Sequence, residues 1–133
     1  MKQSGGNLGV APLMRSVFRI VIAFLFMEHG GQKLLNFPPS PHPMSHLPLL
    51  LLAAGVLELC GGFLVLVGVF TRPVAFILAC EMAVAYVHQH APQGPWPIYN
   101  MGELALLYGI GFLYLAVAGG GPLSLERLWH RGR

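Results

Sequence analysis

Four long apolar runs constrain the fold of this chain more than any other feature of its sequence. They cover about residues 13–35, 47–70, 74–87 and 100–118, and prolines or glycines separate them. Because a helix needs roughly 20 apolar residues to cross a bilayer, these runs predict membrane-spanning helices. The composition agrees, since 55% of the residues are hydrophobic, only 10% are charged and the mean hydropathy is +0.63. The sequence therefore predicts an all-α fold, an integral membrane four-helix bundle.

The length of 133 residues allows one membrane domain, which we expect to cover residues 1–133, and leaves no room for a separate soluble catalytic domain. The first thirteen residues lack the apolar core and the small-residue cleavage site of a signal peptide. We therefore expect the first span to remain as an uncleaved anchor. Cys60 and Cys80 lie inside apolar runs, which favours inert packing, with a redox pair as the alternative.

Lysine and arginine residues are distributed unevenly along the chain. Apart from Lys33, they precede or begin the first run, occupy the turn after the second, and follow the fourth: Lys2, Arg15, Arg19, Arg72, Arg127, Arg131 and Arg133. By the positive-inside rule, both termini and the turn at 71–73 are expected on the cytoplasmic side of the membrane. The tail combines its arginines with Leu125, Leu128 and Trp129, which predicts a short amphipathic segment on the lipid surface and not a nucleic-acid arm.

Acidic side chains inside the runs are the second strong feature. All five acids are glutamates, and the runs contain one each: Glu28, Glu58, Glu81 and Glu103. An acid at mid-span costs roughly 2.5 to 3.5 kcal/mol, against a gain of roughly 0.3 to 0.6 kcal/mol for each Leu, Ile, Val or Phe. Each run can still insert, but the carboxyl groups are expected to turn inward and meet polar partners. The sequence thus predicts a polar pocket that opens toward the outer surface.

Helical spacing gives these acids polar neighbours. Three pairs are spaced so that both members share a helix face: Glu28 with Gln32, His29 with Lys33, and Glu81 with His88. Small residues on the face of Glu58, namely Gly55, Gly61 and Gly62, would let another helix approach closely. The predicted catalytic residues are Glu58, Glu81 and His29. The predicted ligand-binding residues are Glu28, Gln32, Lys33, His88, Asn100 and Glu103.

Several of these residues also have structural interpretations. Lys33 can extend to the lipid head groups from the end of its run. The stretch Asn100-Met101-Gly102-Glu103 resembles a helix capping box, with Asn100 as the cap. For Glu58 and Glu81, a role as hydrogen-bond partners that only hold helices together remains open.

No metal site is predicted. The candidates include side chains of the kinds that four-helix di-metal bundles use, namely His29, Glu58, Glu81, His88 and Glu103. The Glu-x-x-His spacing of those bundles is absent from the sequence.

Five short motifs, in order, resemble those of the DoxX family of small four-span membrane proteins. They begin at the end of the first run and end after the fourth: His29–Leu34, Glu58–Gly62, Gly68–Arg72, Asn100–Glu103 and Gly119–Leu125. The resemblance covers about residues 15–127. It departs from the family pattern at Glu126, where an aspartate is expected, and at Glu28, which the motif does not include.

The resemblance implies a bacterial cytoplasmic-membrane protein. Relatives serve as the membrane subunit of thiosulfate:quinone oxidoreductase or in membrane complexes of thiol chemistry and oxidative-stress defence. The resulting hypothesis is quinone-linked redox chemistry, in which the carboxyls and His29 or His88 bind the quinone oxygens and relay protons. A partner protein would deliver the electrons, and a homo-oligomer is equally compatible with the sequence.

Two other functions stay open at this point. The chain can be a non-enzymatic assembly or chaperone subunit whose buried polar groups only specify helix packing. It can also be a small transporter, although the sequence has neither two inverted halves nor a broken mid-helix.

Overall fold

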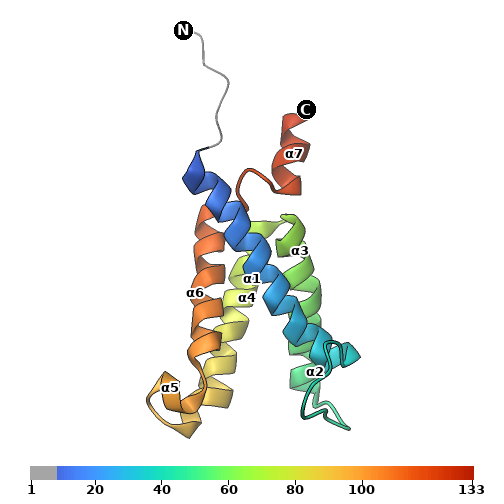
Figure 1. The fold of residues 1–133 in the computed structure, drawn as a ribbon, viewed down its shortest axis with the longest axis vertical. Coiled ribbons are helices and arrows are strands. Elements are labelled where there is room, and N and C mark those ends of the chain that lie inside the picture. Colours follow the sequence, from blue (N-terminus) through green and yellow to red (C-terminus); the bar gives the residue numbers. More distant parts are fainter. Residues whose placement is uncertain (1–8) are drawn as a thin grey trace.

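The computed structural model describes residues 9–133, which form helices and connecting loops with no strand among them (Figure 1). The predicted all-helical membrane fold is confirmed. In chain order the helices are α1 (Val10–Leu35), α2 (Leu49–Val56), the π-helical turn η1 (Leu57–Gly61), α3 (Gly62–Val67), α4 (Thr71–Ala85), the π-helical turn η2 (Tyr86–His90), the 3-10 turn η3 (Ala91–Gln93), α5 (Pro97–Asn100), α6 (Glu103–Ala118) and α7 (Leu125–Arg131). The predictions that concern Lys2 and the other residues of 1–8 lie outside the described part.

Three continuous helical stretches in the described residues are long and apolar enough to cross a membrane, namely Val10–Leu35, Leu49–Val67 and Thr71–Gln93. The fourth apolar helix, α6, is shorter, with 16 residues. The predicted end of the third run at Val87 is wrong, because the helix continues through η2 and η3. Pro92 does not stop it, since a proline in the first turn of a helical segment has no N–H that needs a partner there.

The helices are arranged as two pairs. One pair consists of α1 packed along the continuous stretch α2–η1–α3, and the other consists of α4 packed along α6. The pairs touch each other through α3, η1 and α4 and through α1 and α6. Figure 1 shows them spreading apart toward the loops at 36–48 and 94–102, which we call the loop end. The opposite end, which carries α7, is called the termini end.

Close backbone packing holds the first pair together. A Cβ atom on Gly30 of α1 would lie 2.6 Å from the Leu59 nitrogen and 2.8 Å from the Gly55 oxygen. On Gly62, a Cβ atom would lie 2.6 Å from Met27 Cγ. Only glycine permits this approach, as the small-residue face around Glu58 predicted, and it brings Glu58 directly against α1.

An aromatic cluster joins α1 to α6. The Phe26 ring lies edge-on to those of Tyr108 and Phe112, with centroid distances of 5.1 and 4.7 Å. These three side chains belong to the buried core, together with Leu78 and Leu115. Large apolar side chains remain exposed over the outer surface of the bundle, which is the surface expected to face lipid.

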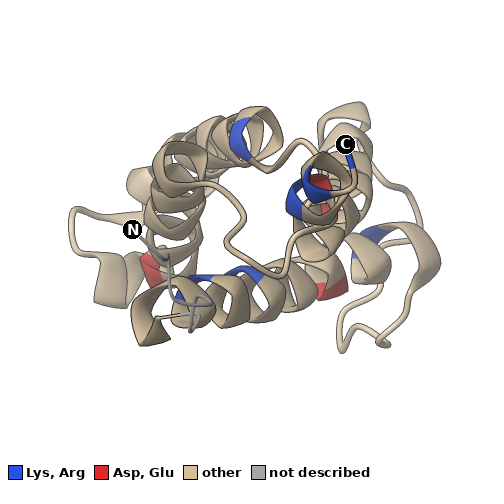
Figure 2. Ribbon diagram, turned by 90° about the horizontal axis from the view of Figure 1, so that it is seen from above, with Lys and Arg blue, Asp and Glu red and all other residues tan. Residues whose placement is uncertain are grey.

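The termini end contains a buried polar network that the sequence did not indicate. Arg19 was expected only to contribute to orientation, but it is 1% exposed, and its Nη1 and Nη2 atoms donate to the carbonyls of Val65 and Leu123, each at 3.3 Å. The Leu123 amide donates to Ser16 Oγ at 3.1 Å. The segment from α6 to α7 therefore crosses the end of the bundle and is fastened to α1 and α3 (Figure 2).

Candidate functional site

A cavity of about 650 Å³ lies between the two helix pairs in the half nearer the loop end. Its apolar lining consists of Phe26, Leu50, Leu51, Ala53, Ala54, Leu57, Ile77, Met82, Val84, Ala85, Met101, Leu104 and Ala105. Its polar and sulfhydryl lining consists of His29, Lys33, Glu58, Cys80, Glu81, His88, Gln89, His90 and Tyr108. An apolar chamber with a few converging polar groups is the usual form of a small-molecule site.

Glu58 and Lys33 form an ion pair on one wall of the cavity. Lys33 Nζ donates to Glu58 Oε1 at 2.5 Å, and the side chains are 28% and 4% exposed respectively. Lys33 thus turns to Glu58 and does not merely extend toward the head groups. The second carboxylate oxygen of Glu58 is buried and has no hydrogen-bond partner among residues 9–133. Glu58 therefore keeps one oxygen free while the other is bonded to an ammonium group.

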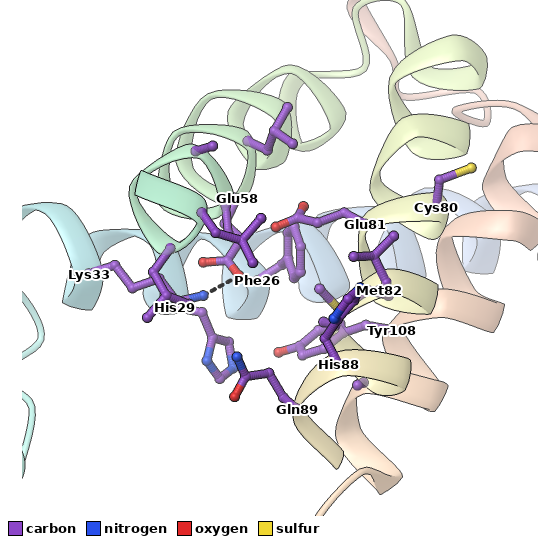
Figure 3. Close-up of a pocket in the computed structure, with 18 of the residues that line it drawn as sticks. Phe26, His29, Lys33, Glu58, Cys80, Glu81, Met82, His88, Gln89 and Tyr108 are labelled. Atoms are coloured by element: carbon purple, nitrogen blue, oxygen red, sulfur yellow. Dashed lines mark hydrogen bonds and ion pairs between the residues drawn. The ribbon is translucent and has the colours of Figure 1, made fainter. Parts of the chain in front are cut away.

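Glu81 projects into the same cavity from α4. Figure 3 shows Glu58 and Glu81 extending into one space, with Phe26 beside them. Both oxygens of Glu81 are buried, and neither has a hydrogen-bond partner within the described part of the chain. A buried carboxyl group without a partner is costly, and such groups in membrane helices generally mark a functional site.

Histidine and tyrosine side chains complete the polar lining. The His29 ring lies edge-on to Tyr108, with a centroid distance of 5.7 Å. His88 and Gln89 come from η2 in the second helix pair, whereas His29 comes from α1 in the first (Figure 3). Both π-helical turns therefore border the cavity, η1 with Glu58 and η2 with His88. Single π-helical turns within α-helices occur frequently at functional sites.

Not all of the predicted residues reach this cavity. Glu28 is half-buried and borders neither this cavity nor the one under the loop 36–48. The face of α1 that does reach it presents Phe26, His29 and Lys33, and Glu28 lies about 100° around the helix from His29. Glu103 is exposed in the first turn of α6, directly after the loop at 94–102. The prediction that all four acids converge is therefore wrong, because only Glu58 and Glu81 meet.

Gln32 borders a second cavity, of about 520 Å³, under the loop 36–48. His29 and Lys33 line both cavities and so form the boundary between them. The second cavity is the more polar of the two, with Asn36, Ser40 and His42 in its wall.

Asn100 positions a loop and does not border the main cavity. It is fully buried, and its Nδ2 atom donates to the Gly94 carbonyl at 2.9 Å and to the Tyr86 hydroxyl at 3.3 Å. Its Oδ1 atom accepts from the Gly102 amide at 2.8 Å. The predicted capping box is wrong, because α6 begins after Gly102 and Asn100 instead belongs to α5.

The sequence interpretation missed Tyr108, Gln89 and Phe26 as lining residues. Tyr108 lies on the same face of its run as Ala105 and Phe112, a spacing that only indicates a core position. Within residues 9–133, no group of three or more His, Cys, Asp or Glu side chains is arranged to hold a metal ion. Cys60 and Cys80 are both free thiols, and Cys80 borders the cavity.

Comparison with known proteins gives concordant results. The model of the DoxX family matches residues 14–91. A Haemophilus influenzae protein described as uncharacterized is 44% identical over 86% of this chain and 90% of its own length. The inner membrane protein YphA of Escherichia coli is 30% identical over 87% of this chain and 90% of its own length. No solved structure matches the chain.

Proposed function

This chain belongs to the DoxX family and is a multi-pass inner-membrane protein, and we propose that its loop-end cavity binds the head group of a membrane quinone and exchanges protons with it. The observation that carries this proposal is Glu81, whose two buried carboxylate oxygens have no hydrogen-bond partner among residues 9–133 and lie in an otherwise mainly apolar chamber. A quinone ring needs apolar walls for its faces and a hydrogen-bonding group for each carbonyl oxygen. The cavity offers both.

The walls suit a flat ring. Phe26 and Tyr108 supply aromatic surface, and Met82 supplies a polarizable thioether that adapts to the ring edge. Glu58 extends into the space from η1 in the first helix pair, and Glu81 and His88 extend into it from α4 and η2 in the second (Figure 3). A ring in this position would have titratable groups near both carbonyls.

The proposed reaction is the reduction of a quinone to a quinol. A quinone takes up two electrons and two protons to become a quinol. Glu81 supplies one proton directly to a carbonyl oxygen, and His29 or His88 supplies the second. The two electrons come from a reductant on a partner protein, for which a pair of thiols that becomes a disulfide is the simplest class. The two protons that these thiols release replace those that Glu81 and the histidine give to the quinone. The Lys33 to Glu58 ion pair stays in place, so this part of the wall keeps no net charge.

Direct binding tests this function. The protein in lipid nanodiscs should bind a ubiquinone analogue, and Glu81→Leu should weaken binding by at least about tenfold, the equivalent of 1.4 kcal/mol. Glu103→Gln is the matched control, because this glutamate is exposed outside the cavity and its loss should leave the affinity unchanged. Equal affinities for the wild type and Glu81→Leu would contradict the proposal.

The second candidate is a non-enzymatic assembly subunit, and one contact favours it. The Lys33 to Glu58 bond joins α1 to η1 and would hold the first helix pair together without any ligand. In that case Glu58→Gln lowers stability or recovery of partner proteins, while the purified wild type binds no quinone. The two functions thus differ in the behaviour of the unmodified protein.

A further inference from the structure

We propose that the ligand enters the loop-end cavity sideways from the bilayer, through an opening between α2 and α4, and that it carries a long apolar tail that remains in this opening. The identity of the head group rests on the proposed function. The position of the opening does not, because it follows from the helix arrangement alone.

The opening is visible in the side chains that line the cavity and are also exposed. Leu50 on α2 is 61% exposed, and Ile77 and Val84 on α4 are 51% and 49% exposed. Ala53 on α2 is exposed as well. These side chains contribute to the inner wall and the outer surface at once, so they form the rim of a mouth.

Helix packing explains why the mouth lies there. Since α2 packs against α1, and α4 packs against α6, each helix is held by its own pair. The two pairs approach each other through α3 and η1, which lie nearer the termini end, and then diverge (Figure 1). The α2 half of the second span is therefore left apart from α4. Alanines at 53, 54 and 85 keep the side chains along this gap short.

The depth of the mouth determines what can pass through it. Ala53 lies four residues inside the start of α2, which corresponds to about 6 Å along the helix, and Val84 lies nine residues before the end of η3, or about 13 Å. Both positions fall within helices long and apolar enough to span a membrane. The mouth thus faces acyl chains and not water, and a molecule that enters it must dissolve in hydrocarbon.

The polarity of the cavity sets the orientation of that molecule. Two of the polar groups, His29 and Lys33, lie on α1 and not on the helices that border the mouth, at the boundary to the second, more polar cavity. A ligand with one polar ring and one hydrocarbon tail therefore fits with the ring near Glu81 and the tail between Leu50 and Ile77. A compact polar solute would make no favourable contact with the apolar side chains of the mouth.

Chemical labelling tests the route without any quinone. In a background with Cys60→Ser and Cys80→Ser, Glu81→Cys places one thiol inside the cavity. In nanodiscs, a membrane-dissolved maleimide should label this thiol at least about tenfold faster than a membrane-impermeant sulfonated maleimide. Adding Ala53→Trp should narrow the mouth and slow the membrane-dissolved reagent about tenfold. Adding Ile110→Trp instead, on an exposed face of α6 that does not line the cavity, should change neither rate.

Each result decides the route. Faster labelling by the sulfonated reagent, or no effect of Ala53→Trp, would overturn the sideways entry. Labelling by neither reagent would also overturn it, because the mouth would then be covered, for example by a second copy of the chain.

Quinone binding to the wild type is measured in parallel and tests the tail. A decyl-tailed benzoquinone should bind at least about tenfold more tightly than the same ring without a tail, and Ala53→Trp should remove most of this difference. Binding of neither quinone, combined with blocked labelling by Ala53→Trp, would contradict the proposed function and leave the route intact. Equal affinities for the two quinones would contradict the proposal that an apolar tail occupies the opening.

Discussion

The two ends of the bundle both bury polar side chains, but they use them in different ways. At the termini end, Arg19 donates to two backbone carbonyls through its Nη atoms. Of its three guanidinium nitrogens, only Nε has no partner among the described residues. At the loop end, Glu81 has no partner for either oxygen in the same part of the chain, and it faces a cavity of about 650 Å³.

The difference also extends to the backbone. The Glu126 amide donates to the Gly68 carbonyl at 3.0 Å, and its carboxylate accepts from the Thr71 amide at 3.4 Å, so the first turn of α7 is fixed to the α3–α4 turn. The loop end has instead separated helix pairs and two cavities. Polar groups whose partners belong to the protein stabilise the fold. Polar groups directed into a cavity cost stability and are available for ligands.

The largest expected effect is at Arg19. Arg19→Ala should lower the free energy of unfolding by about 4 kcal/mol, because one buried and one part-buried carbonyl lose charged donors and a large side chain leaves a cavity. Denaturant titration in detergent micelles measures this change. The control is Arg127→Ala, an exposed residue of α7 whose loss should change stability by less than about 0.5 kcal/mol. Similar losses of stability in the two variants would show that the buried network around Arg19 does not stabilise the fold.

Two glycines with positive φ give the next comparison. Gly68 (φ +76°) lies at the termini end, where an added Cβ would fall within 2.7 Å of Arg19 and Ser124, and Gly94 (φ +143°) lies at the loop end with no atom within 4 Å of that position. Both alanine variants pay for backbone strain, about 1 to 2 kcal/mol. Gly68→Ala should cost about 2 kcal/mol more, because it also overpacks the network. Thermal unfolding measures both, and equal losses would contradict tight packing around Arg19.

The sequence predicted the scaffold better than it predicted the site. Apolar run length was sufficient for the helices, because hydrocarbon permits few alternatives to a helix that satisfies its own backbone. It also identified Glu58 and Glu81, which are too deep in their runs to reach water. The prediction that Glu28 and Glu103 reach the same cavity failed. The cost of burial indicates that an acid needs a partner, but it does not indicate which face of the helix points inward. The cytoplasmic position of the termini stays a prediction.

Features that depend on three-dimensional packing had no local signal. The π-helical turns η1 and η2 are not indicated by residue spacing, and the burial of Arg19 depends on a segment more than a hundred residues away. Asn100 was recognised as a local hydrogen-bonding residue, but its partners, Gly94 and Tyr86, precede it in the chain and hold the loop. Such roles become visible only when the segments meet.

Substitution of Glu81 should raise the stability of the protein, whereas substitution of Arg19 should lower it. Glu81→Leu removes a buried carboxyl group that has no partner in the described residues and replaces it with an apolar side chain, so stability should rise by about 2 kcal/mol. The same change should weaken quinone binding, a trade-off typical of functional sites. Denaturant titration and ligand binding on the same sample measure both. A loss of stability in Glu81→Leu would mean that this carboxyl group holds the fold together, as the polar groups of the termini end do.

The smallest expected effect concerns the one ion pair of the described residues. It tests whether the polar groups of the loop end stabilise the fold or are available for a ligand. Lys33→Met and Glu58→Gln, singly and combined, form a double-mutant cycle with an expected coupling of about 1 kcal/mol, because Lys33 is 28% exposed and the pair is partly screened. Denaturant titration of all four proteins measures it. A coupling above about 3 kcal/mol would place Glu58 with Arg19 as a structural residue and would favour the assembly function. A coupling near zero would mean that the ion pair adds nothing to stability, and the assembly function would lose the contact that favours it.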